Sequence, residues 1–213
     1  MDLHTISTYR YAHDRDDLRL ADGERIVAGG TWFFSEPQVA STGVVDISRI
    51  GWKPFEDLPD GGLRIAATAT VAQLAELPAQ RGWHAHPLLF QCATALLASF
   101  KIWNVATVGG NICRSFAAAS MVSLASGLDG RALVWRADGT DYTVPVAELV
   151  TGNGTNTLGD GDVLRAIDIP GYALRARTGF RKIALAELGR SGAVITGRHD
   201  EDDTAVFGIT AAT

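Results

Sequence analysis

Two glycine pairs carry the clearest chemical signal in this sequence of 213 residues. The first lies in Ile26 to Thr31 (IVAGGT) and the second in Thr107 to Asn111 (TVGGN). Glycine has no Cβ, so a phosphate can approach the main chain closely and successive amides can turn towards it. Each pair alone is more often an ordinary turn. Two pairs flanked by hydroxyl and carboxamide donors indicate a site for a phosphate-bearing cofactor.

Neither segment fits the spacing of a P-loop or of the dinucleotide fingerprint of a Rossmann fold, so both of these folds are disfavoured. A third pair, Gly61-Gly62, follows Pro59-Asp60 and leads directly into an apolar segment. Its composition is typical of a hairpin or loop turn rather than of a binding site.

Composition narrows the possible functions. The chain is 46% hydrophobic and 20% charged, with a net charge of -5 and no basic run, which argues against nucleic acid as a partner. No apolar stretch reaches the length of a membrane span, and the first residues do not resemble a signal peptide, so we expect a cytoplasmic protein. Cys92 and Cys113 are the only cysteines. Two thiols cannot hold an iron–sulfur cluster, and we expect no metal site in this chain.

The surrounding pattern indicates an α+β fold. We expect strands at 25–28 and 44–47 in a first unit, residues 1–55, and a loop at 52–62 at its end. A second unit, residues 56–172, holds a capping box at Thr70 and Gln73. It also has a strongly periodic buried helix from Leu88 to Phe100, in whose first turn Pro87 lies. A small-residue helix is expected at 115–126, and strands at 63–67, 132–136, 141–146 and 163–169.

A third unit, residues 173–213, contains strand patterns at 179–183, 192–196 and 204–210. The last of these patterns is apolar and ends close to the last residue. Proteins usually cover an apolar edge strand. We therefore expect this C-terminal α+β unit to be incomplete in the sequence given.

Together with their neighbours, the glycine segments resemble a known protein family. Ile26 to Phe34 (IVAGGTWFF) and Lys101 to Asn111 (KIWNVATVGGN) resemble the FAD-binding medium subunit of molybdenum hydroxylases. This family includes the flavin domain of xanthine dehydrogenase and the flavoprotein of carbon monoxide dehydrogenase. The resemblance extends to Asp162 to Leu164, Ile167 to Pro170 and Phe180 to Lys182. It implies a PCMH-type FAD-binding fold, similar to vanillyl-alcohol oxidase, made of two α/β subdomains followed by a C-terminal unit.

The resemblance also implies which residues bind FAD. The first segment would lie on the diphosphate, and the second would hold phosphate and ribityl groups. Leu164 matches a position at the edge of the isoalloxazine, and Lys182 matches a lysine near the ring, although a core leucine and a surface lysine are equally compatible with the sequence. The residues implied are Val27, Ala28, Gly29, Gly30, Thr31, Trp32, Phe33, Thr107, Gly109, Gly110, Asn111, Ser120, Leu164 and Lys182.

The sequence departs from the common family pattern around the second segment. Trp103 and Val105 stand where many members have arginines. Residues 116–120 read FAAAS where many members have S-P-A-A-D, so Ser120 replaces an acid that accepts from a flavin hydroxyl. A serine is the weaker partner for that role.

The resemblance implies an oxidoreductase subunit with no catalytic acid or base of its own. Electrons would arrive from a small 2Fe-2S subunit, which receives them from a large subunit with a molybdopterin cofactor, and would leave to a small-molecule acceptor. Two other functions stay open. One is a stand-alone flavin reductase similar to UDP-N-acetylenolpyruvoylglucosamine reductase, and the other is a non-catalytic assembly protein on the same fold.

Overall fold

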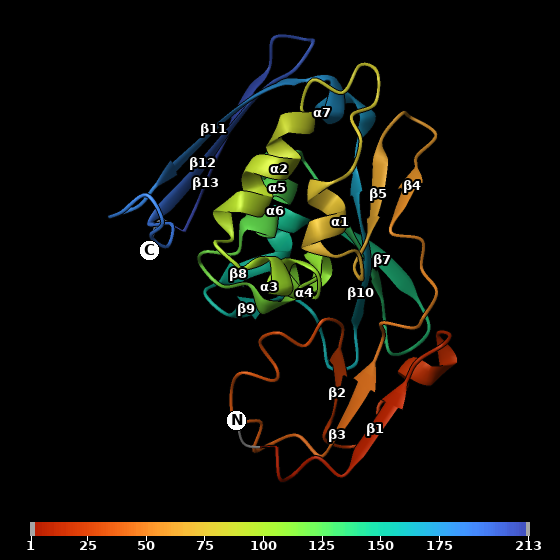
Figure 1. Cartoon of the computed structure of the whole chain (residues 1–213). Helices are drawn as coiled ribbons and strands as arrows, with labels where there is room; N and C mark the ends of the chain where they lie inside the picture. The colour runs from red at the N-terminus through yellow and green to blue at the C-terminus, as the bar shows by residue number, and fades with distance from the viewer. Residues whose placement is uncertain (1–2, 212–213) are drawn as a thin grey trace.

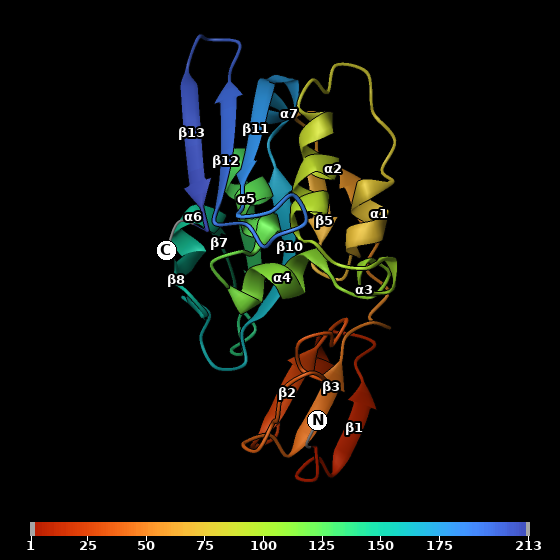
Figure 2. The same ribbon diagram turned by 60° about the vertical axis from the view of Figure 1, so that its left-hand side comes forward.

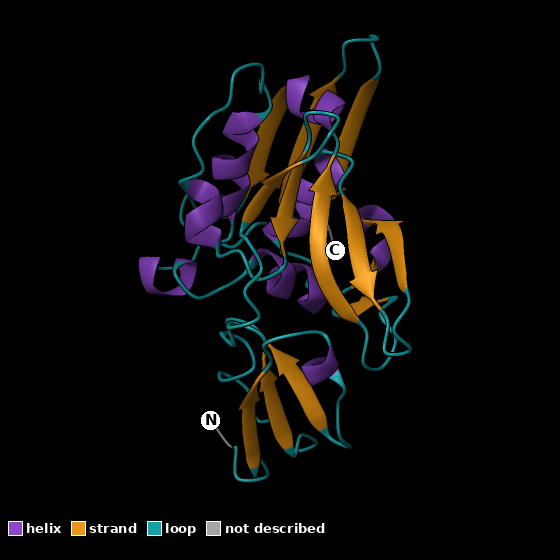
Figure 3. Ribbon diagram, turned by 90° about the vertical axis from the view of Figure 1, so that its right-hand side faces the viewer, coloured by secondary structure: helices purple, strands orange, loops and turns teal. Residues whose placement is uncertain are grey.

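The computed structural model describes residues 3–211 and has the α+β architecture that the sequence predicts. A small N-terminal sheet lies apart from a larger body, which holds the other sheets and the α-helices (Figures 1 and 3). No helix within residues 3–211 combines the length and the apolar character needed to cross a bilayer.

The N-terminal sheet is parallel. It contains β1 (Thr8–Tyr11), β2 (Glu24–Val27) and β3 (Gly43–Asp46) in the order β1-β3-β2, and the 3-10 helix η1 (Asp16–Leu18) lies in the first connection. Parallel strands end at one edge, and here that edge faces the larger body (Figure 1). The first glycine segment follows β2, so it begins at this edge.

The central sheet of the larger body is antiparallel and has five strands in the order β4-β5-β10-β6-β7. Gly61, with φ of +81°, turns the hairpin between the first two strands, as its sequence suggested. The predicted loop at 52–62 is thus partly wrong, because β4 is too short to show an alternating pattern. The strands are β4 (Phe55–Asp57), β5 (Leu63–Ala66), β6 (Arg131–Trp135), β7 (Asp141–Pro145) and β10 (Val163–Ile169).

A group of helices lies between this sheet and a third sheet (Figure 2). α4 packs on β5 and β10, and α5 packs on the third sheet. Thr70 caps α1 and forms the predicted capping box with Gln73. The helices are α1 (Val71–Ala75), α2 (His86–Ala95), α3 (Phe100–Trp103), α4 (Val108–Arg114) and α5 (Ser120–Gly127).

Two helix predictions need correction. The buried helix ends at Ala95 because Leu97 adopts a left-handed φ of 51°, and Phe100 is 73% exposed rather than buried in its stripe. The helix expected at 115–126 begins only at Ser120, since Ser115, with φ of 50°, ends α4 instead.

The remaining elements complete the larger body. The third sheet is antiparallel in the order β11-β12-β13, and its strand boundaries lie within three residues of the predicted ones. A two-stranded sheet and two short helices connect the others. These elements are α6 (Val146–Leu149), β8 (Val150–Gly152), β9 (Thr155–Asn156), α7 (Gly171–Arg175), β11 (Arg177–Ile183), β12 (Ala193–His199) and β13 (Ala205–Thr210).

An aromatic joint connects the small sheet to the larger body. The rings of Trp52 and Trp135 meet edge to face with their centroids 5.3 Å apart. The guanidinium carbon of Arg165 lies 4.5 Å from the centroid of Trp52, at a bulge in β10. Val163, also on β10, joins the hydrophobic cluster of the small sheet. The N-terminal sheet and the larger body, hereafter the two lobes, therefore share part of one core.

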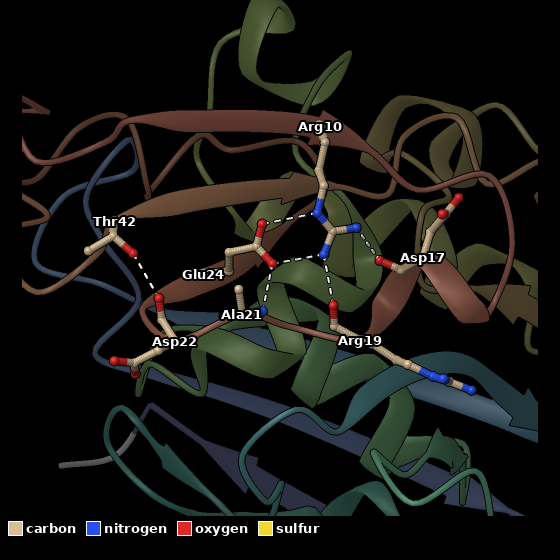
Figure 4. A network of polar contacts seen from close by, with 7 residues as sticks. All are labelled: Arg10, Asp17, Arg19, Ala21, Asp22, Glu24 and Thr42. Carbon is tan, nitrogen blue, oxygen red and sulfur yellow. Dashed lines mark hydrogen bonds and ion pairs between the residues drawn. The ribbon is translucent and has the colours of Figure 1, made fainter.

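An ion pair between a half-buried arginine and a buried glutamate organises the N-terminal sheet (Figure 4). Arg10 on β1 donates to both carboxylate oxygens of Glu24 on β2, at 3.0 and 2.8 Å, and also to the carbonyl oxygens of Asp17 and Arg19. Glu24 is buried and accepts a further hydrogen bond from the amide of Ala21. The contact with Arg10 is the main reason that the pKa of Glu24 is lowered.

We expect Glu24→Gln to lower the free energy of unfolding by about 2–3 kcal/mol at pH 7, because the Arg10 guanidinium loses its charged acceptor. The lowered pKa in the folded state stabilises the protein above about pH 4.3, the value for an unfolded glutamate. This contribution disappears as the pH falls through the folded pKa. Urea unfolding between pH 7 and pH 3 should therefore show a weaker acid dependence in the variant.

Arg19→Gln is the matched control, since its ion pair with Asp16 is almost fully exposed. We expect it to change the unfolding free energy by less than about 0.5 kcal/mol. Equal losses in the two variants would contradict the role of the buried pair.

Candidate functional site

The first glycine segment presents a run of unused amide donors. After β2 the chain turns at Gly30, whose φ is +65°, and the amide of Phe34 donates to the carbonyl of Gly30 at 2.9 Å. Within residues 3–211, the five amides from Gly29 to Phe33 make no hydrogen bond. Consecutive free amides next to a left-handed residue form a concavity that suits an anion.

The position of this turn depends on glycine. A Cβ on Gly29 would overlap the carbonyl oxygen of Val105, so only glycine allows the two backbones to come this close. Val105 stands two residues before Thr107, where the second glycine segment begins. The two segments, which are far apart in sequence, therefore lie side by side.

A cavity of about 470 Å³ opens between them. Its size is within the range of small-molecule sites. Both glycine segments contribute to its wall, and many of the lining side chains are polar. It is lined by Ala28, Gly29, Phe34, Asp46, Ser48, Trp52, Pro54, Thr68, Thr70, Gln73, Asn104, Val105 and Thr107.

The second glycine segment is helical, and its amides are already used. Thr107 caps α4 by accepting from the amide of Gly110 at 3.0 Å, and the amide of Gly109 donates to the carbonyl of Ala67. A Cβ on Gly109 would overlap Ala67, so this glycine lets α4 close on the residue that follows β5. These amides are therefore not free donors, because the capping threonine makes a helix from a sequence that resembles a turn. That the segment holds phosphate stays a prediction.

Apolar residues support the first turn from behind. Val27 and Phe33 are buried together with Val44 on β3, and they form the small core under the turn. Trp32 lies beside Arg114, whose guanidinium carbon is 3.6 Å from the ring centroid of the indole. Thr31 is half-buried at the same turn.

The other predicted site residues are spread along the larger body. Asn111 accepts from the amide of Met121 at 3.0 Å and so joins α4 to the start of α5. The hydroxyl of Ser120 is buried without a hydrogen-bond partner in the described part of the chain. Leu164 is buried in the main core, and Lys182 is half-buried on β11. Neither Leu164 nor Lys182 lines the cavity beside the first turn.

The titratable groups near the site are hydrogen-bonded or buried. Asp46, at the end of β3, accepts from the amide of Ser48 at 2.7 Å and from the hydroxyl of Tyr9. Burial and this carboxylate raise the pKa of Tyr9. Burial raises the pKa of the Cys113 thiol to about 12, so it is not a nucleophile at neutral pH. Within residues 3–211, no group of three or more His, Cys, Asp or Glu residues could hold a metal ion.

Several residues of this candidate site carried little or no signal in the sequence. Asp46 had one available signal, its position at the end of a predicted strand. Val105 contributes a backbone carbonyl, which no side-chain pattern reveals. Thr70 and Gln73 were recognised only as a helix cap, and their place in the cavity wall depends on how the two lobes meet.

Comparison with known proteins agrees with this geometry. Residues 15–172 match the family described as FAD binding domain in molybdopterin dehydrogenase. Over 112 residues the chain is 35% identical to the putative xanthine dehydrogenase FAD-binding subunit XdhB of Escherichia coli (strain K12). That match covers 52% of this chain and only 37% of the relative's length.

Solved structures show the same fold at low identity. Quinoline 2-oxidoreductase from Pseudomonas putida 86 superposes with a TM-score of 0.80 and 18% identity, over 96% of this chain and 73% of the other. Carbon monoxide dehydrogenase from Hydrogenophaga pseudoflava gives 0.82 and 17%, over 96% and 74%. The predicted fold is thereby confirmed. Because the family match covers most of its length, this chain belongs to the FAD-binding domains of molybdopterin dehydrogenases.

Proposed function

We propose that this chain binds FAD and serves as the flavin subunit of a molybdopterin-dependent hydroxylase or dehydrogenase. It would accept electrons from a 2Fe-2S subunit and pass them to an external acceptor. The observation that carries the proposal is the run of free amides at the first glycine turn, beside a cavity that two distant segments enclose.

The residues of this chain fit a dinucleotide. The amides from Gly29 to Phe33 are the donors for the diphosphate, because they lack any other acceptor among the described residues and glycine leaves the backbone open to it. Ala28 and Thr107 border the adjoining cavity. The other residues that the family resemblance implies, among them Leu164 and Lys182, complete the proposed site.

Bound FAD would supply the redox chemistry, and the protein would supply position and electrostatics. The side chains at the first turn are suited to these tasks. Val27 and Phe33 hold the turn rigid from the core, and Arg114 places a positive charge beside it. A partner subunit would select the oxidised substrate.

The first test of this proposal concerns the cofactor itself. The full chain, expressed and purified, should carry a flavin absorbance band with about one flavin per chain, and the nucleotide released by denaturation should have the mass of FAD. A chain without this band that also fails to take up added FAD would contradict the proposal. That result would favour a non-catalytic assembly protein on the same fold.

The second prediction concerns the turn. Gly30→Ala should weaken FAD binding at least about tenfold, because a left-handed alanine costs about 1–2 kcal/mol and its Cβ would meet the ring of Phe34. The dissociation constant can be measured by quenching of flavin fluorescence. Gly61→Ala is the matched control, since Gly61 has a similar φ of +81° with nothing within 4 Å of its Cβ. If both variants bind FAD equally well, the turn is not the site.

The third prediction concerns electron entry. When the FAD-loaded chain is mixed without oxygen with a chemically reduced 2Fe-2S subunit from the same source, the oxidised-flavin band should disappear. The oxidised form of the same subunit is the control and should leave the band unchanged. A flavin that instead accepts electrons directly from NADPH in the isolated chain would point to a stand-alone reductase.

A further inference from the structure

Arg114, at the end of α4, is a cation without a counter-charge. Its Nε is buried and has no hydrogen-bond partner, and it forms no ion pair with any acidic residue in 3–211. Burial lowers the pKa of Arg114, and no neighbouring carboxylate raises it again. An uncompensated charge that is partly removed from water is costly, and proteins rarely keep one without a use.

Two aromatic rings hold this guanidinium in place. Its central carbon lies 3.6 Å from the ring centroid of Trp32 and 4.5 Å from that of Phe116, and the two rings meet edge to face at 6.4 Å. Cation–π contacts of this kind fix a guanidinium without using its N–H donors. The terminal N–H donors of Arg114 therefore stay available for a ligand.

The location connects the guanidinium to the first turn. Trp32 belongs to the run of residues whose amides lack an acceptor, so the cation rests on a side chain of the anion-binding turn itself. Neutral amide donors on the turn and a guanidinium fixed on the turn's own Trp32 side chain are complementary to a phosphate group, which takes an arginine in a two-pronged contact.

We infer that Arg114 is a binding residue for the diphosphate of the dinucleotide, positioned by Trp32 and Phe116. The inference rests on the proposed binding of FAD and adds a charged contact to it. It assigns the cluster of Trp32, Arg114 and Phe116 a role in selecting a ligand that carries a diphosphate.

The test uses the full chain freed of flavin and titrated with FAD at low and high salt. Arg114→Met keeps the length of the side chain and removes its charge, and we expect the dissociation constant to rise about 10- to 100-fold. The dependence of log Kd on log salt should also become shallower, because salt screens a charge that the variant lacks. Arg114→Lys should lose less than about tenfold. Inorganic pyrophosphate should compete with FAD on the wild type and at least tenfold less well on Arg114→Met.

Arg136→Met is the matched control, since Arg136 also stacks on an aromatic ring, that of Tyr142 at 4.6 Å, but lies at the hairpin between β6 and β7. It should bind FAD as the wild type does. If the wild type binds FAD while Arg114→Met shows the same affinity and salt slope, the inference is overturned and the proposed function stands. If the wild type binds no FAD, both fall. A purely structural role would lower the melting temperature of the apoprotein and leave the salt slope and pyrophosphate competition unchanged.

Discussion

The close contact of Gly29 with the carbonyl of Val105 sets the distance between the two lobes. Any side chain at Gly29 would force the first turn away from the second segment and widen the cavity between them. The contact is made by the backbone of Val105, and within residues 3–211 no group accepts from the amides of the turn. The donors of the turn are therefore free beside the cavity.

The two glycine pairs look alike in sequence and act differently. At the first pair the backbone turns away from regular structure, and its amides have no acceptor among the described residues. At the second pair the amides are consumed by the cap of Thr107 and by Ala67, and the absence of a Cβ lets α4 approach the central sheet. One pair presents donors, and the other positions the helix that ends at Arg114. Both are needed to bring Arg114 onto Trp32.

The sequence predicted most of the elements because their signals are local. The capping box at Thr70, the mostly apolar run of β10 and the apolar strand before Gly29 need no tertiary contact to be recognised. Errors occurred where tertiary contacts override local preference. The left-handed Leu97 ends α2 before Phe100, although the apolar spacing continues. β4 exists because it pairs with β5, and its three residues carry no pattern of their own.

The site was harder to predict than the fold, for a related reason. Glycine-rich segments could be found by residue type, but the partner of Gly29 is a carbonyl oxygen, which every residue carries. Arg114 gave no signal either, since an arginine at a helix end is common. Its importance emerges only from what surrounds it in space, namely two aromatic rings and no carboxylate.

The free amides of the first turn and the unpaired guanidinium of Arg114 are both ordered by folding, before any ligand binds. Folded proteins normally pair their polar groups, and here five successive amides and a guanidinium remain without an acceptor in the described part of the chain. The cores under Trp32 and Phe33 and the shared core of the two lobes keep the turn in this arrangement without a ligand. The cost of ordering these donors is therefore met during folding rather than during binding. An anion that enters the site would lose little free energy to rearrangement of the protein, as the proposed diphosphate site requires.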